Sequence, residues 1–138
     1  MTPLAKLTIW YSTLSVNTLP DIERLYAPQA SFKDPFNDVI GVKAIEKIFE
    51  HMFKTTDSPK FVVIDSIEQG DQAFLTWHFI FGLNGKEYIV KGGTHLRFDE
   101  TGLVTMHRDY WDAAEELWQK LPFIGGIVSW LRGKFRAK

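Results

Sequence analysis

The chain has 138 residues, of which 45% are hydrophobic and 24% are charged, with a formal net charge of −1 and no cysteine. This length suits one domain with its own core, and the near-zero charge disfavours a nucleic-acid-binding surface. The absence of cysteine excludes disulfides, thiolate metal sites and a cysteine nucleophile.

The spacing of apolar residues differs between the first and the second part of the chain. In the first part, apolar residues recur every three or four positions, as on the buried face of a helix. The stretch SFKDPF alternates polar and apolar residues until Pro35 removes the backbone donor that would extend a strand. In chain order, the predicted elements are a helix over residues 1–15, a short helix over 16–28 with Thr18 as N-cap and Pro28 at its end, a strand that ends at Asp34, a loop over 36–41 and an amphipathic helix over 42–54.

In the second part the period changes to two, which is typical of strands with one buried face. An Asn-Gly pair at 84–85 separates two such runs and predicts a tight hairpin turn. The predicted elements are strands over residues 60–69, 72–82, 87–99 and 103–112, followed by helices over 113–121 and 127–138.

Helices followed by a run of antiparallel strands are typical of the α+β class. We expect a curved, mostly antiparallel sheet with helices packed on its concave side. Residues 1–121 are predicted to form this domain, and residues 122–138 to add a C-terminal helical extension to it. Aromatic residues make up 14% of the chain, so the concave side is expected to enclose a cone walled by rings.

Asp34 raises the first functional question. Strand alternation places its carboxylate on the same side as Phe32, so if Phe32 points into the fold, Asp34 does too. A buried carboxylate costs several kcal/mol unless something compensates it. Asp34 is therefore either a structural hydrogen-bond acceptor or a working group.

Several stretches together resemble the NTF2-like superfamily, in particular its SnoaL-like and ketosteroid isomerase-like members. The resemblance covers residues 10–112, and the order of predicted elements is similar to the family's order. It implies an NTF2-like cone and a site inside it. The stretches that carry it are ASFKDPF at 30–36, GVKAIEKIF at 41–49, GTHLRFDETGLV at 93–104 and HRDYWD at 107–112.

In ketosteroid isomerases the aspartate of an Asp-Pro dipeptide is the general base, and the resemblance implies this role for Asp34. The tyrosine that donates to the oxyanion corresponds to Trp10, with Tyr11 one residue away, and the second, acidic donor corresponds to Thr94. Both usual donors are thus replaced, which disfavours a true 3-ketosteroid isomerase.

The last-strand motif is similar to that of limonene epoxide hydrolases, whose aspartate corresponds to Asp109. The arginine and second aspartate of that chemistry correspond to Trp77 and Phe79, which disfavours it. SnoaL-like polyketide cyclases use a single aspartate with a nearby histidine, and Asp109 and His107 resemble that pair.

Alternation places His107, Asp109 and Trp111 on one face of the last strand, and the family register turns this face inward. A carboxylate among rings loses hydration, which raises its pKa toward the range useful for acid–base work. The mechanistic hypothesis is proton abstraction and return on an apolar carbonyl compound, with Asp34 or Asp109 as base and His107 as orienting or accepting group. The ligand-binding candidates are Trp10, Tyr11, Phe32, Trp77, Phe79, Thr94 and Trp111.

Structural roles compete with each assignment. Asp34 before Pro35 is typical of an Asx turn, in which the carboxylate accepts hydrogen bonds from the following loop. Asp109 could pair with an arginine or with the first helix, and His107 could be a satisfied core histidine. The histidines have no metal-ligand spacing, so neither a metal nor another cofactor is expected.

The expected partner is a small apolar molecule of steroid, polyketide or lipid type, and family members are usually homodimers. The alternative function is a non-catalytic ligand carrier or accessory subunit. The segment 122–138 is basic and amphipathic, which indicates a membrane-surface contact, a packed or dimer-forming helix, or a lid over the cavity. The sequence has no secretory signal pattern and no apolar run that could span a bilayer, so a cytoplasmic location is expected.

Overall fold

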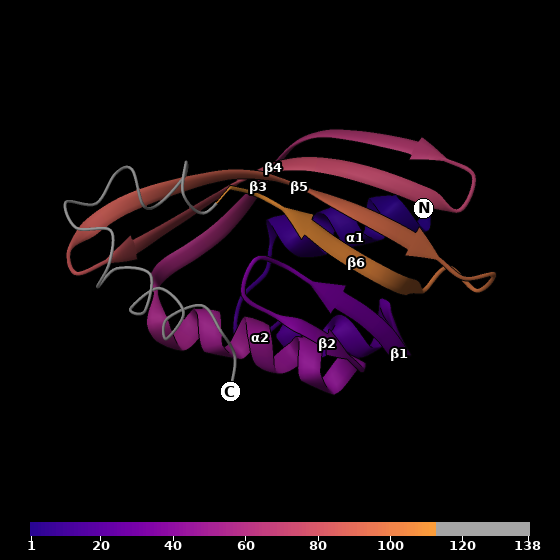
Figure 1. Cartoon of the computed structure of the whole chain (residues 1–138), viewed down its shortest axis with the longest axis horizontal. Coiled ribbons are helices and arrows are strands. Elements are labelled where there is room, and N and C mark those ends of the chain that lie inside the picture. The colour runs from indigo at the N-terminus through magenta and orange to yellow at the C-terminus, as the bar shows by residue number, and fades with distance from the viewer. Residues whose placement is uncertain (113–138) are drawn as a thin grey trace.

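A computed structural model describes residues 1–112 (Figure 1). The two helices predicted over 113–121 and 127–138, and with them the extension over 122–138, lie outside the described residues. The described elements, in chain order, are α1 (Pro3–Ser12), the 3-10 helix η1 (Leu19–Arg24), β1 (Tyr26–Lys33), β2 (Asp38–Ile40), α2 (Val42–Thr55), β3 (Asp57–Gln69), β4 (Gln72–Leu83), β5 (Lys86–Phe98) and β6 (Val104–Tyr110).

The strands form one six-stranded sheet in the order β2-β1-β6-β5-β4-β3. Only β1 and β6 pair in parallel, and the other four neighbours are antiparallel. Irregular register in β3, between Asp57 and Lys60 and between Val63 and Asp65, bends its long ladder with β4. The predicted α+β fold with a curved, mostly antiparallel sheet is confirmed.

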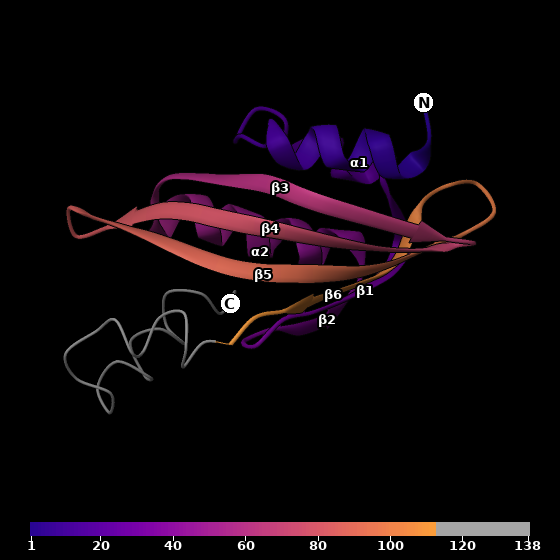
Figure 2. The same ribbon diagram turned by 90° about the horizontal axis from the view of Figure 1, so that it is seen from above.

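Both α-helices lie on one face of this sheet, and the long strands β3, β4 and β5 arch over them (Figures 1 and 2). α1 packs on β3, whereas α2 packs on β1 and β3. The apolar stripe of α2 points into the resulting core, as its spacing predicts. Its buried residues are Val42, Ile45, Ile48, Phe49 and Met52.

The first half differs from expectation in three details. The short second helix is a 3-10 helix of six residues, and the Thr18 side chain does not cap it. Pro28 does not end that helix but lies within β1, in the stretch between Tyr26 and Ser31 where the pairing with β6 is irregular and needs no regular donor. The predicted loop over 36–41 contains β2, which pairs with the end of β1.

Candidate functional site

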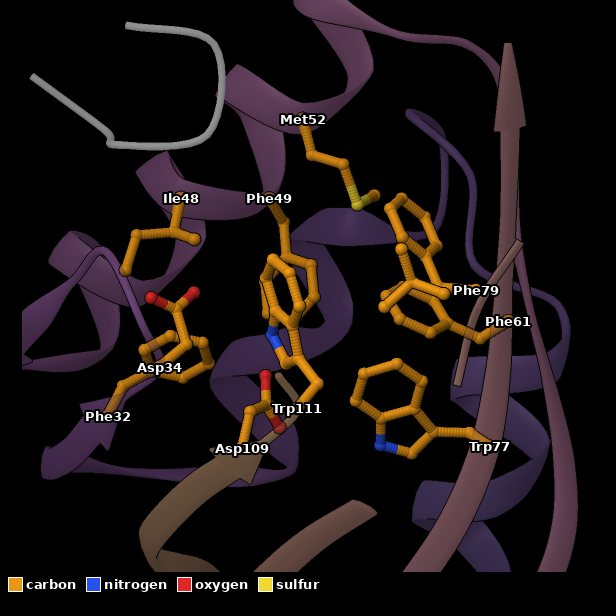
Figure 3. Close-up of a pocket in the computed structure, with 11 residues that line it drawn as sticks. Phe32, Asp34, Ile48, Phe49, Met52, Phe61, Trp77, Phe79, Asp109 and Trp111 are labelled. Atoms are coloured by element: carbon orange, nitrogen blue, oxygen red, sulfur yellow. The ribbon is translucent and has the colours of Figure 1, made fainter. Parts of the chain in front are cut away.

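A cavity opens between the concave face of the sheet and α2 (Figure 3). The cavity has a volume of about 70 Å³, enough for several waters or a small organic group. Its wall is mostly aromatic and aliphatic, with two carboxylates among the rings. The lining residues are Phe32, Asp34, Ile48, Phe49, Met52, Phe61, Trp77, Phe79, Val90, Asp109 and Trp111.

The loop after β1 holds the carboxylate of Asp34. Its Oδ1 accepts hydrogen bonds from the backbone N–H of Phe36 at 2.8 Å and of Asn37 at 2.6 Å, and the Asn37 side-chain amide lies 3.2 Å from both oxygens. The Asp34 N–H in turn donates to the Asn37 carbonyl at 2.9 Å. Asp34 thus fills the Asx-turn role and faces the cavity at the same time.

The carboxylate of Asp109 is held by side chains instead. Thr94 lies directly opposite Asp109 on β5, and its hydroxyl donates to Oδ1 at 2.6 Å. The direction is set by Trp77, because an indole N–H can only donate and it lies 2.7 Å from the Thr94 oxygen. His107 Nε2 lies 2.7 Å from the same Oδ1. In residues 1–112 the second oxygen, Oδ2, has no hydrogen-bond partner, and the side chain is 17% exposed.

Two buried tyrosines lie behind His107. The hydroxyl of Tyr26 is 2.6 Å and that of Tyr11 is 3.0 Å from His107 Nδ1, and the two hydroxyls also contact each other. Burial raises the pKa of both phenols well above the usual value, so both keep their protons and can donate. The sequence analysis gave Tyr11, next to Trp10, as a ligand-binding candidate and did not identify Tyr26.

The hydrogen bonds among the Tyr11 hydroxyl, the Tyr26 hydroxyl and His107 Nδ1 indicate which nitrogen of His107 carries its proton. If Nδ1 is unprotonated, one tyrosine donates to it and the other donates to its partner hydroxyl. If Nδ1 carried a proton, it would be a third donor beside the two tyrosine hydroxyls and could no longer accept a hydrogen bond. Only two of these three donors would then find an acceptor, and the buried donor left without one would cost roughly 1–3 kcal/mol. The hydrogen bonds therefore favour neutral His107 with its proton on Nε2, directed at Asp109. Donors from both sides converge on Asp109 Oδ1.

The surroundings of Asp34 raise the pKa of its carboxyl group. Burial, and next the negative charge of Asp109, raise its pKa from 3.8 to about 6, although the hydrogen bonds from Phe36 and Asn37 act in the opposite direction. Asp34 can therefore hold or release a proton near neutral pH.

Two glycines of β5 permit close packing at this site. A Cβ at Gly92 would lie 2.6 Å from the Trp77 indole, on the cavity face of the sheet. A Cβ at Gly93 would lie 2.7 Å from the Phe74 ring, on the opposite face. The pair in VKGG thus leaves room for one ring on each side of the strand, a role that the sequence analysis did not identify.

The structure brings most of the predicted residues together. Asp34 and Asp109 share the cavity with Phe32, Trp77, Phe79 and Trp111. A smaller hollow continues from it, and Tyr11, Thr94 and His107 line this hollow. Trp10 lies apart from both: it is buried in the core, and its indole donates to the Thr18 carbonyl at 2.9 Å. The lining residues that the sequence analysis missed are Ile48, Phe49, Met52, Phe61 and Val90, and the first three were visible only as a helix stripe.

Residues 1–112 contain no group of three or more His, Cys, Asp or Glu side chains able to hold a metal ion. Within the same range, no helix has the length and apolar character needed to cross a membrane.

Comparison with solved structures supports the fold. A hypothetical protein with a ketosteroid isomerase-like fold from Catenulispora acidiphila, solved in complex with trimethylamine, superposes with a TM-score of 0.72 at 17% identity, over 88% of this chain and 96% of that one. A candidate SnoaL-like polyketide cyclase from Jannaschia sp. CCS1 gives 0.70 at 13% identity, over 82% and 85%. TerC, co-crystallized with polyporic acid, gives 0.69 at 13% identity, over 86% and 94%.

Sequence comparison identifies the family. No curated protein matches the chain. The model of the SnoaL-like domain matches residues 8–107, which is most of the described chain and includes β1, α2 and nearly all of the sheet. The chain belongs to the SnoaL-like domain family, within the NTF2-like and ketosteroid isomerase-like fold.

Proposed function

We propose that the protein binds a small, mostly apolar molecule in the ring-lined cavity and moves a proton on it. One observation carries the proposal: two carboxylates from distant segments, Asp34 and Asp109, face the same cavity, which is otherwise almost entirely apolar. The two carboxylates differ in their hydrogen bonding, since backbone N–H groups hold Asp34 and side chains hold Asp109, and this allows them separate roles as acid and base.

In this mechanism Asp109 is the base. Its Oδ2 takes a proton from a C–H next to a ligand carbonyl, while His107 and Thr94 keep Oδ1 in place. Asp34, in its protonated form, donates a hydrogen bond to the oxygen on which negative charge develops. The proton then returns from Asp109 to the carbon skeleton, so the reaction is an isomerisation or the proton-transfer step of a cyclisation.

The test is hydrogen–deuterium exchange. β-Tetralone, an apolar ketone with acidic C–H groups, is incubated with the protein in deuterated water, and loss of the C–H signals is followed by NMR. We expect exchange above the buffer rate, a loss of about 100-fold or more in Asp109→Asn, and a smaller loss in Asp34→Asn. Glu100→Gln, which changes an exposed acid outside the cavity, is the matched control. Equal exchange in wild type and Asp109→Asn would refute Asp109 as the base.

A non-catalytic carrier is the second candidate. The two residues that correspond to the oxyanion donors of ketosteroid isomerases already donate their hydrogen bonds within the protein. Trp10 donates to Thr18 and Thr94 donates to Asp109. The relatives crystallised with trimethylamine and with polyporic acid are consistent with ligand binding alone. A carrier would bind β-tetralone without accelerating exchange, so binding and exchange measured on one sample separate the two functions.

We also propose a homodimer formed through the outer face of the sheet. This face carries apolar side chains that are half exposed in the single chain, among them Ile67 (67% exposed), Phe74 (38%) and Tyr110 (48%). Light scattering after size exclusion should give twice the chain mass. Phe74→Lys should shift it toward monomer, and a monomeric wild type at micromolar concentration would rule the dimer out.

The basic segment 122–138 is proposed as a membrane-surface contact. The support is its sequence, which combines Lys and Arg with an apolar stripe at helical spacing. Sedimentation with anionic and with neutral vesicles, for the full chain and for a chain without residues 122–138, tests it. Equal sedimentation of the two chains with anionic vesicles would contradict it.

A further inference from the structure

The ionisable side chains among the cavity's described lining residues are all acidic. These described lining residues include two acids and no lysine, arginine or histidine. The one nearby histidine, His107, lies in the adjoining hollow, and both of its ring nitrogens are already hydrogen bonded. A negatively charged ligand would therefore meet two carboxylates and no basic group from the described lining residues.

The walls of the cavity add to this preference. Six aromatic rings line it, and the faces of such rings carry partial negative charge that attracts cations. The indole N–H of Trp77 donates to Thr94, so a ligand would contact the ring of Trp77 and not its N–H group. Phe61 stacks on Phe79 with 4.6 Å between ring centroids and meets Trp77 edge-on at 5.7 Å, which gives a contiguous aromatic wall. Figure 3 shows this wall on one side and the two carboxylates on the other.

We propose that the ligand of this cavity is an apolar cation: a protonated or quaternary amine whose charge lies near Asp34 and Asp109 and whose alkyl or aryl groups contact the rings. This inference rests on the proposed function, because it uses the same cavity, and it narrows the ligand class. A cation placed near both acids also offsets the repulsion between their negative charges. An amine-bearing ketone would satisfy both the charge of the site and the proton-transfer chemistry.

Three probes of nearly the same size but different charge test the proposal. Phenyltrimethylammonium is the cation, tert-butylbenzene replaces its nitrogen by carbon and is neutral, and benzoate is the anion. Dissociation constants are measured by NMR chemical-shift titration, with the indole N–H signals as reporters. The proteins compared are wild type, Asp109→Asn, Asp34→Asn and the surface control Glu100→Gln.

We expect the cation to bind wild type at least about tenfold more tightly than tert-butylbenzene, and benzoate to bind more weakly than either. Asp109→Asn should reduce the cation's affinity about tenfold and leave that of tert-butylbenzene within about twofold, which also shows that the variant is folded. Glu100→Gln should change neither.

The outcomes distinguish the two proposals. If tert-butylbenzene binds as tightly as the cation, or if benzoate binds best, the cation preference is wrong and the ligand-binding function stands. If the cation binds but Asp109→Asn and Asp34→Asn leave its affinity unchanged, the carboxylates are not its partners and the inference also fails. If no probe shifts the indole signals, both the cation preference and the cavity's role in binding are refuted.

Discussion

The two cavity carboxylates are held in opposite ways. Asp34 is fixed by its own loop, through donors two and three residues further along the chain. Asp109 is fixed by side chains from other segments: Thr94 on β5 donates to it directly, and the tyrosines of α1 and β1 act through His107. The comparison shows that a short motif can build one half of this site, whereas the other half requires the assembled sheet.

The difference has a physical consequence. The Asx turn of Asp34 can form as soon as the loop closes, because its partners are near in sequence. The two side chains bonded to Asp109 are buried: Thr94 lies on another strand, and His107 is in turn bonded to Tyr11, which lies 96 positions earlier in the chain. Loss of Asp109 should thus disturb the core, and loss of Asp34 should disturb mainly one loop.

The largest effect is expected for Asp109→Ala. Removal of the carboxylate leaves the donors of His107 and Thr94 buried without an acceptor, and we expect a loss of about 3 kcal/mol in the free energy of unfolding. Asp109→Asn keeps an acceptor oxygen and should cost about 1 kcal/mol. Urea denaturation of the two variants checks this, and equal losses would show that the network is not what stabilises this region.

Gly92→Ala tests the packing that supports the same network. A methyl group at this position would collide with the Trp77 indole, whose N–H anchors Thr94. We expect a loss of about 2 kcal/mol and a changed Trp77 fluorescence spectrum. The double variant with Trp77→Phe should recover part of the stability, and no recovery would place the clash elsewhere.

The pH dependence of stability tests the Asp34 side. Its pKa is raised to about 6, so the contribution of Asp34 is fully favourable below about 3.8, its unfolded value, and is lost as the pH rises through about 6. For a partly buried group we expect this loss to be about 2 kcal/mol.

Asp34→Asn keeps the acceptor of the turn and removes the charge. Its free energy of unfolding relative to wild type should therefore be about 2 kcal/mol more favourable near pH 8 than near pH 4. Chemical denaturation at the two pH values measures the difference, and Glu100→Gln, which changes an exposed acid outside the cavity, is the comparison. A pH-independent difference between Asp34→Asn and wild type would contradict the raised pKa.

The smallest effects are expected for the tyrosines. Tyr26→Phe should cost about 1 kcal/mol, and because Tyr11 can still donate to Nδ1, His107 should keep its proton on Nε2. The double variant with Tyr11→Phe removes both donors. Nitrogen-15 NMR of the imidazole, which distinguishes the two tautomers and the charged form, should then show a changed protonation pattern for His107. An unchanged pattern would mean that the tyrosines do not set the tautomer.

The strand half of the fold was predictable because a period of two is a strong local signal. The predicted strands over 72–82 and 87–99 differ from β4 and β5 by a single residue at some ends. The errors fall where tertiary pairing overrides local preference: Pro28 was predicted to stop a helix, yet the neighbouring strand β6 accommodates it within β1.

The candidate site was predictable in part. The resemblance and the alternation of β6 pointed to Asp34, His107, Asp109 and Trp111, all of which lie at the cavity or in the adjoining hollow. The same reasoning placed Trp10 at the cavity wall, whereas the structure places Tyr11 at the hollow and Trp10 in the core. Neighbouring side chains on a helix point in directions about 100° apart. Matching the family's tyrosine to Trp10, one residue before Tyr11, therefore selected a ring that points elsewhere.

The amino-acid sequence was sufficient to determine that a carboxylate follows Phe32 into the fold and that His107 and Asp109 share a strand face, because both follow from side-chain alternation within a few residues. Only the tertiary structure decided that these groups meet at one cavity, that Tyr11 and Tyr26 stand behind His107, and that the described wall offers no positive charge to a ligand. Those relations depend on which strands become neighbours and on how far the sheet bends, and no local pattern encodes a distance between segments that are far apart in the chain.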